Sequence, residues 1–273
     1  MEFAPHTKNK NLWRKIHRSP LFDISQFVLL VGAIIWFFYN STAELGYNWQ
    51  WYQIPKYIFA HDEAGYVAGP LWDGLMVTFR ISGISLLLAF SIGLATALFR
   101  LSNSFVARII ARVYLEVIRN TPLLVQLFFI YFVLSPVLDI SAFASAVLAL
   151  SLFEGAYASE IFRAGIISIH KGQWEAAFSM GLNTYQTYRL IILPQAIRQI
   201  LPPLTSQAVS LIKDSALVST IAIYDLTMRG QTIIAETFLV FEIWFTVAAI
   251  YLTVTLALSL TVFYMEKRFK IEY

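Results

Sequence analysis

Residues 173–194 read QWEAAFSMGLNTYQTYRLIILP, and this stretch decides how the rest of the chain is organised. Ala176 and Ala177 are strong helix formers and are small enough to let another surface approach closely. We expect a short helix here with Glu175 in its first turn, where a carboxylate favours the positive end of the helix dipole. The beginning of the stretch therefore predicts a short amphipathic helix.

The second half of the same stretch carries signals that end one helix and begin others. Gly181 is expected to end the first helix, because glycine adopts the left-handed conformation that terminates helices. Asn183 and Thr184 can cap a second helix. Pro194 stands where a further helix begins, at a position that needs no amide donor. The sequence predicts a compact knob of two short helices joined by a tight turn.

The composition of the chain around this knob is that of a membrane protein. Of its 273 residues, 58% are hydrophobic and 14% are charged, whereas soluble domains are about one quarter charged. The apolar residues fall in blocks of roughly 17–25, the length that a helix needs to cross the hydrocarbon core. Cysteine is absent, and the four histidines show no metal-ligand spacing, so we expect no metal site. Nothing in the composition suggests nucleic acid.

The apolar blocks predict an all-α membrane fold with about six transmembrane helices and both termini in the cytoplasm. The spans are expected at about 21–39, 71–99, 113–137, 141–166, from 195 through 223, and 238–265. We divide the chain into an N-terminal extension (1–69) with the first span and an aromatic interfacial segment, a membrane domain (70–266) and a cytoplasmic tail (267–273). Prolines at 122, 202 and 203 are candidate hinge points within spans.

The distribution of lysine and arginine sets the orientation. Basic residues concentrate before residue 22, at 100–112, at 163–198 and after residue 266, while the opposite loops hold Lys56, Arg229 and, near a helix end, Lys213. Positive residues favour the cytoplasmic side. The knob at 173–194 is therefore predicted to face the cytoplasm.

The stretch at residues 173–194 resembles a feature of a known family. Residue types, spacing and predicted side match the EAA loop of ABC importer permeases, which in that family inserts into a groove on the ATP-binding subunit. The resemblance implies a type I ABC importer transmembrane domain at 70–266 with a cytoplasmic coupling helix. It assigns the coupling role to seven residues: Glu175, Ala176, Ala177, Gly181, Ile191, Leu193 and Pro194.

Three further stretches resemble the polar amino acid permeases of the HisMQ type: residues 114–126, 155–177 and 213–219. That subfamily implies a pathway for polar amino acids (glutamate, aspartate or glutamine-like, or basic) in the bacterial inner membrane. It implies as partners a dimer of ATP-binding subunits, a second permease that is identical or paralogous, and a periplasmic solute-binding protein. No phosphate-binding loop of the Gly-x-x-x-x-Gly-Lys-Ser/Thr type occurs, so ATP and Mg are expected on the partner, and this chain is not expected to be an enzyme.

Ionisable residues inside predicted spans are candidates for the substrate path, because charge at membrane depth is costly. Arg80 and Glu154 lie at similar predicted depths and could receive the carboxylate and ammonium groups of an amino acid, with Tyr157 and Glu160 nearby. The alternative is that Arg80 and Glu154 pair with each other or with the backbone and only hold helices together. Glu116–Arg119 and Glu160–Arg163 are spaced as structural i,i+3 pairs.

A second function class is an ion-coupled secondary transporter of amino acids, with Glu154 and Glu160 as proton carriers. It predicts transport without an ATPase partner. It leaves the pattern from Glu175 to Pro194 unexplained.

Overall fold

The structure is a computed structural model that describes residues 20–44, 46–62 and 65–269. It separates into two units, residues 1–50 and 51–273, and each is described by itself. In the first unit α2 (Pro20–Glu44) is one helix with exposed apolar side chains, Phe27 and Leu29 among them. Its apolar part, Phe22–Phe37, is shorter than the roughly 20 residues that a helix needs to cross the hydrocarbon core. The predicted helix is confirmed, whereas its crossing of the membrane stays a prediction. The basic tail at residues 8–18 lies outside the described residues, and its cytoplasmic position stays a prediction.

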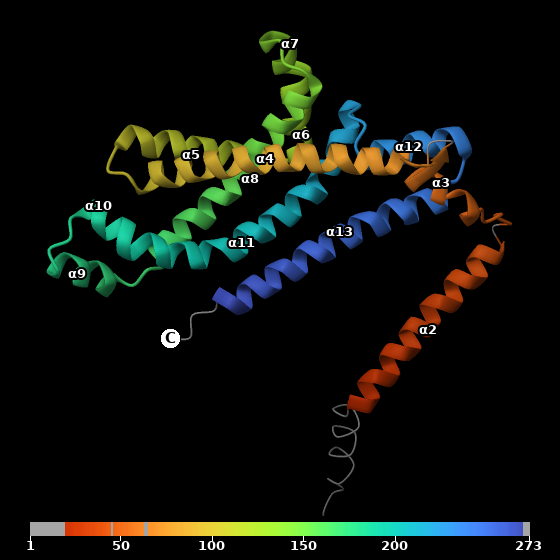
Figure 1. The fold of residues 1–273 in the computed structure, drawn as a ribbon, viewed down its shortest axis with the longest axis horizontal. Coiled ribbons are helices and arrows are strands. Elements are labelled where there is room, and N and C mark those ends of the chain that lie inside the picture. Colours follow the sequence, from red (N-terminus) through yellow and green to blue (C-terminus); the bar gives the residue numbers. More distant parts are fainter. Residues whose placement is uncertain (1–19, 45, 63–64, 270–273) are drawn as a thin grey trace, which may run out of the picture. The chain divides into compact units, whose positions relative to one another are not determined.

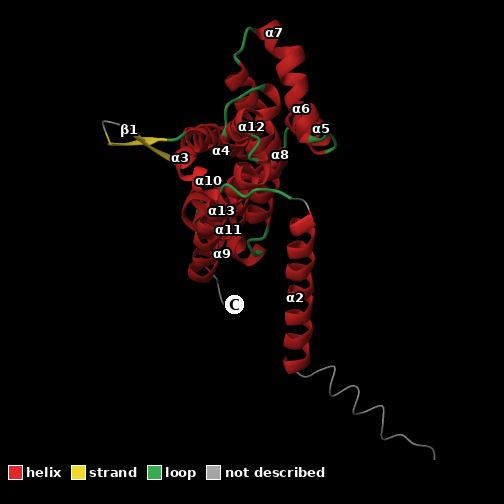
Figure 2. Cartoon of the chain, turned by 90° about the vertical axis from the view of Figure 1, so that its right-hand side faces the viewer, coloured by secondary structure: helices red, strands yellow, loops and turns green. Residues whose placement is uncertain are grey.

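The second unit begins with short elements in the segment predicted to lie at a membrane interface. These are a 3-10 turn η1 (Trp51–Gln53), α3 (Pro55–Ile58) and an antiparallel hairpin of β1 (Phe59–Asp62) and β2 (Gly65–Ala68), the yellow strands of Figure 2. Gly69 then lies against the backbone of Tyr57, where a Cβ atom would approach the Tyr57 carbonyl to 2.5 Å. Glycine is therefore required where this segment joins the next helix.

Two long helices, α4 (Pro70–Leu101) and α8 (Ala142–Ile167), make the most extensive helix contact of the second unit (Figure 1). A Cβ atom at Gly93 would lie 2.8 Å from the Cβ of Ala158 and 3.0 Å from the Gly155 carbonyl oxygen. Ser151 adds a hydrogen bond from its hydroxyl to the Ser85 carbonyl across the same contact, 3.3 Å long. Small residues let the two backbones approach closely, as is typical of packed helices in membranes.

The prediction of one continuous helix for the third span, at about 113–137, is wrong. The chain forms α5 (Phe105–Arg119) and then a separate run made of α6 (Leu123–Phe128), the π-helical η2 (Phe129–Leu134) and α7 (Ser135–Leu138). The two parts meet at an angle of 105°. Pro122 occupies the N-cap of α6, and a proline there offers no amide to continue the preceding helix and restricts the residue before it. The turn predicted at Asp139 is confirmed, with φ at 52°.

The rest of the unit follows the predicted order of elements. It comprises α9 (Lys171–Ser179), α10 (Thr184–Thr187), the π-helical η3 (Tyr188–Ile192), α11 (Leu193–Asp214), the 3-10 segment η4 (Ser215–Ile221), α12 (Leu226–Thr237) and α13 (Val240–Phe269). Although Pro202 and Pro203 lie inside α11, the helix is continuous through both. A hinge at these prolines stays a prediction.

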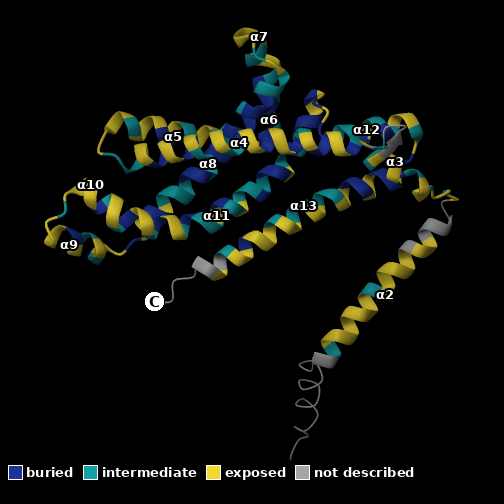
Figure 3. Cartoon of the chain, in the orientation of Figure 1, coloured by how far each residue is buried: buried dark blue, intermediate teal, exposed yellow. Residues whose placement is uncertain are grey.

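Among the described helices, three are long and apolar enough to cross a membrane: Pro70–Leu101, Ala142–Ile167 and Val240–Met265. The number becomes four if α5 and the bent run after it form one span. The other predicted spans correspond to α2 and to α11, whose charged end carries Lys213 and Asp214. Burial concentrates where α8 meets its neighbours, while α13 and α5 keep exposed faces (Figure 3).

Candidate functional site

The knob predicted at residues 173–194 begins earlier than expected. Helix α9 starts at Lys171, with His170 as its N-cap, and the His170 Nδ1 atom accepts a hydrogen bond of 3.0 Å from the Gly172 amide. Glu175 therefore lies in the second turn, and its predicted place in the first turn is wrong. The cause is local, because the imidazole of His170 provides a cap that the pattern from Gln173 onward does not contain.

Gly181 ends α9 in the way the sequence predicts. Its φ of +79° is left-handed, and the Leu182 amide donates to the Ala177 carbonyl at 3.2 Å, while the Gly181 amide donates to the Phe178 carbonyl at 2.9 Å. These two bonds form a Schellman motif, which satisfies carbonyls that the end of a helix otherwise leaves unpaired. The predicted turn between the two short helices is confirmed.

Asn183 begins the second short helix with a reciprocal cap. Its side chain accepts from the Gln186 amide at 2.9 Å, and the Gln186 side chain accepts from the Asn183 amide at 3.0 Å. This capping box satisfies two donors at once. Pro194 lies in the first turn of α11, as predicted.

The knob is rooted in the protein on one side and exposed on the other. Trp174 and Tyr188 meet edge to face, with ring centroids 4.9 Å apart, and Ala177 and Ile192 are buried at 2% and 0% exposure. The opposite side presents exposed apolar side chains: Phe178, Met180, Tyr185 and Leu190. The root is therefore packed, and the turn after α9 is fixed by hydrogen bonds.

The seven residues singled out in this stretch do not share one environment. Ile191 is half-buried and Ala177 is buried, so these two contribute to the root. The other five are exposed: Glu175, Ala176, Gly181, Leu193 and Pro194.

Glu160 on α8 forms the centre of an ion-pair cluster. It pairs with Arg100 of α4, with Arg119 of α5 at 3.2 Å and with Arg163 of its own helix at 3.0 Å. The predicted Glu160–Arg163 pair is confirmed. The predicted Glu116–Arg119 pair is wrong within the described chain, because Arg119 turns to Glu160 and Glu116 instead accepts a hydrogen bond of 3.0 Å from Asn120.

Glu154 lies six residues before Glu160 on α8, in a different environment. It is 1% exposed, and its Oε2 atom accepts a hydrogen bond from the Gln207 side chain of α11. No donor reaches its other oxygen, Oε1, within the part of the chain that the structure describes. The carboxyl group of Asp214 lies beside it. Two acidic side chains and one amide therefore converge between α8 and α11.

The structure does not bring Arg80 to this group. Arg80 lies on an exposed face of α4, and no ion pair joins it to Glu154 among the described residues, so the alternative of a direct Arg80–Glu154 pair is wrong. Tyr157 instead packs beneath the Arg119 guanidinium, whose carbon lies 5.9 Å from the ring centroid. Sequence reasoning missed Gln207, although a glutamine within a predicted span was a signal that could have been followed.

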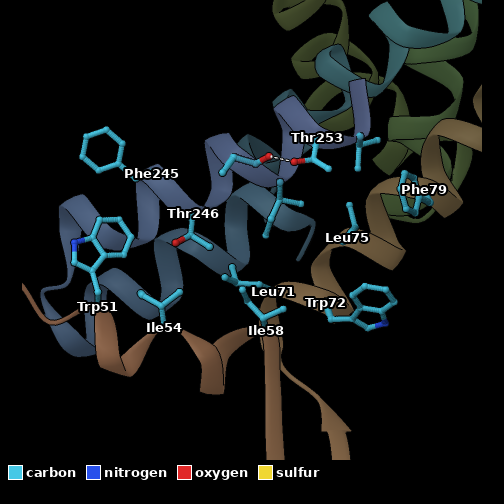
Figure 4. A pocket seen from close by; sticks show the side chains of 13 residues that line it. Trp51, Ile54, Ile58, Leu71, Trp72, Leu75, Phe79, Phe245, Thr246 and Thr253 are labelled. Atoms are coloured by element: carbon cyan, nitrogen blue, oxygen red, sulfur yellow. Dashed lines mark hydrogen bonds between the residues drawn. The ribbon is translucent and has the colours of Figure 1, made fainter. Parts of the chain in front are cut away.

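An apolar groove lies elsewhere, between α4, α13 and the segment that precedes α4 (Figure 4). It has a volume of about 900 Å³, and the described residues that line it are apolar or threonine, including Trp51, Trp72 and Phe245. A zwitterion would find no opposite charge there. The groove is therefore a poor candidate for binding a charged solute.

Comparison with known proteins places the chain in a family. Residues 89–271 match the family described as "Binding-protein-dependent transport system inner membrane component". The chain belongs to this family. The permease is accordingly a multi-pass inner-membrane transport subunit rather than an enzyme, and it works with an ATP-binding subunit and a substrate-binding protein.

Individual relatives cover most of the permease. It is 42% identical over 204 residues to the glutamine transport system permease protein GlnP of Escherichia coli (strain K12), which covers 74% of this chain and 93% of that protein. It is 41% identical over 201 residues to the L-cystine transport system permease protein TcyB of Bacillus subtilis (strain 168), covering 72% and 86%. A solved structure titled as an amino acid ABC transporter with histidines has a TM-score of 0.69 at 38% identity, covering 73% of this chain and 94% of that one. These likenesses support the ATP-driven class over the ion-coupled secondary transporter.

Proposed function

We propose that this permease forms the translocation pathway for polar amino acids in an ATP-driven importer. The names of its relatives, which include glutamine and L-cystine systems, support an amino acid as the cargo. The observation that carries the proposal is the knob at residues 171–194, with its packed root and exposed apolar side. Such a knob suits a permease that is moved by another protein and does no chemistry of its own.

The ATP-binding partner docks on the exposed side of this knob, near Glu175 and Gly181. ATP and Mg bind to that partner, and its closure moves α8 and α11 through the rigid root. The spans then open toward the periplasm, where the binding protein delivers the amino acid. The basic residues at 100–112 and 163–198 favour placing the knob in the cytoplasm, with both termini on the same side. A second permease, identical or paralogous, completes the pathway.

The substrate path passes the acidic group formed by Glu154 and Asp214. The carboxyl groups of Glu154 and Asp214 lie side by side, and a substrate ammonium group can bind where these two acidic groups meet. Because Glu154 itself is almost fully buried, the substrate approaches from the side of the half-buried Asp214. Arg80, Tyr157 and Glu160 remain candidates for other parts of the path, with the exposed Arg80 suited to a path shared with the second permease.

Docking is tested by co-purification of the permease with its ATP-binding subunit. Glu175→Lys and Gly181→Asp are expected to lose the partner, because both alter the exposed side of the knob without removing its root. Lys56→Glu is the matched charge reversal, placed in the segment before α4, and is expected to keep the partner. Full retention of the ATPase by both knob variants would contradict the proposal.

The acidic group is tested by substrate uptake and membrane abundance of Glu154→Gln. We expect abundance close to that of the parent, since glutamine preserves the shape and can still accept from Gln207, and an uptake rate at least tenfold lower. A stable Glu154→Gln protein with unaltered uptake removes Glu154 from the path.

A further inference from the structure

A cavity of about 310 Å³ opens between α4, α5 and α8 at the end of the helices that carries the ion-pair cluster. Five arginines line it: Arg100, Arg108, Arg112, Arg119 and Arg163. The described acidic residues in its lining are Glu116 and Glu160, so the cavity wall has a net charge of +3. Positive charges held this close repel one another. The repulsion favours the binding of an anion from outside the protein.

Two of these arginines form no ion pair with the described part of the second unit. Arg100, Arg119 and Arg163 share the carboxylate of Glu160, whereas no acidic side chain in residues 51–62 and 65–269 lies within ion-pair distance of Arg108 or Arg112. These two side chains stand one turn apart on α5 and line the same cavity. Two planar guanidinium groups in this arrangement suit a phosphate, because each can donate two parallel hydrogen bonds to its oxygens.

The surface beside the cavity is apolar. Phe105, Ile109 and Val113 alternate along α5 with Arg108 and Arg112, and all three are exposed. An anion that reaches Arg108 and Arg112 is thus next to a surface that fits hydrocarbon chains. The lining also includes Leu101, Leu115 and Ile167. At roughly 30 Å³ for each water-sized group, the cavity has room for a phosphate with its glycerol attached.

We propose that the arginine cavity binds the phosphate of an anionic phospholipid, whose acyl chains lie along the exposed apolar face of α5. Arg108 and Arg112 bind the phosphate oxygens, and the Glu160 cluster holds the remaining arginines in place around it. The basic loops predict that this end of the helices lies at the cytoplasmic leaflet, where anionic lipids are concentrated. Binding of a lipid there would hold α5 against α8 and α4.

The test uses the full-length permease in nanodiscs of phosphatidylcholine, titrated with short-chain phosphatidylglycerol and read by native mass spectrometry. The double variant Arg108→Gln/Arg112→Gln is expected to bind phosphatidylglycerol at least tenfold more weakly, because two charge-assisted partners are lost. Both side chains are exposed and unpaired, so the fold is expected to be unaffected. Arg198→Gln, an exposed arginine of α11 that does not line the cavity, is the matched control and should bind like the parent.

Competition with inorganic phosphate tests whether the bound phosphate belongs to a lipid or is a free anion. We expect millimolar phosphate to compete weakly, because it lacks the acyl chains. Equal binding of phosphatidylglycerol by the parent and the double variant would overturn the proposal. Phosphate that occupies the cavity in pure phosphatidylcholine as tightly as phosphatidylglycerol does would overturn the assignment to a lipid.

Discussion

Gly181 allows the rigidity of the knob to be tested through a single backbone angle. Its φ is +79°, and a Cβ atom added there would meet nothing within 4 Å. A substitution with alanine therefore introduces no clash, and its cost is the left-handed backbone conformation alone, about 1–2 kcal/mol. Asparagine tolerates this conformation better than other residues with a side chain, so Gly181→Asn is the matched control.

The expected readout is local opening of the knob. If alanine destabilises the turn by about 1–2 kcal/mol, the open population rises by about 5- to 30-fold. Hydrogen exchange at the Leu182 amide, which donates to Ala177 in the native turn, should accelerate by that factor in Gly181→Ala and by much less in Gly181→Asn. The measurement uses the permease in nanodiscs, and amides in the middle of α8 serve as an internal reference that should not change.

Two outcomes would refute this reasoning. Equal exchange in the parent and in Gly181→Ala would mean that the left-handed conformation does not hold the turn. Equal acceleration in Gly181→Ala and Gly181→Asn would mean that something other than the backbone angle is responsible. Affinity for the ATP-binding partner should follow the same order, with the parent strongest and alanine weakest, because a knob that is open part of the time binds in proportion to its closed fraction.

The other predictions concern packing, charge and pH. Gly93→Ala should destabilise the protein by about 1–3 kcal/mol, because the new methyl group meets Ala158 at 2.8 Å. The control Gly83→Ala meets nothing within 4 Å and should not lower the thermal unfolding midpoint. Equal midpoints for the two variants would contradict the close approach of α4 and α8. Glu160→Gln should lower the midpoint by the equivalent of about 1–3 kcal/mol, since it leaves three arginines facing one another, and an unchanged midpoint would show that the ion pairs contribute nothing. Burial raises the pKa of Asp225, the N-cap of α12, to about 6 from 3.8, so the folded state binds its proton more tightly than the unfolded state does. The free energy of unfolding should then fall by about 2–3 kcal/mol as pH rises from 4 to 6, and Asp225→Asn, which keeps the cap, should remove this pH dependence in chemical unfolding.

Local sequence signals correctly predicted the features that depend on neighbours in the chain. The turn at Gly181, the cap at Asn183 and the helix start at Pro194 were all readable, because each depends on the conformation of one residue and on hydrogen bonds within a few positions. The order and type of the long helices were readable for the same reason, since apolar blocks of sufficient length favour helices in a membrane. One local error, the start of α9, came from the histidine cap at His170.

Partners that lie far apart in the chain were decided by the tertiary structure. Helical periodicity shows which side chains share a face, yet it does not show which helix lies opposite. Glu160 pairs with Arg100, sixty residues away, and Glu154 accepts a hydrogen bond from Gln207, whereas one alternative from the sequence paired it with Arg80. The 105° bend after α5 could not be read from the sequence either, because Pro122 permits a break but does not set its angle. The class of transporter and the form of the knob at residues 173–194 could be read from the sequence. Which charged side chains meet was decided by the packing of α4, α5, α8 and α11, because these contacts depend on how separate helices are oriented against one another.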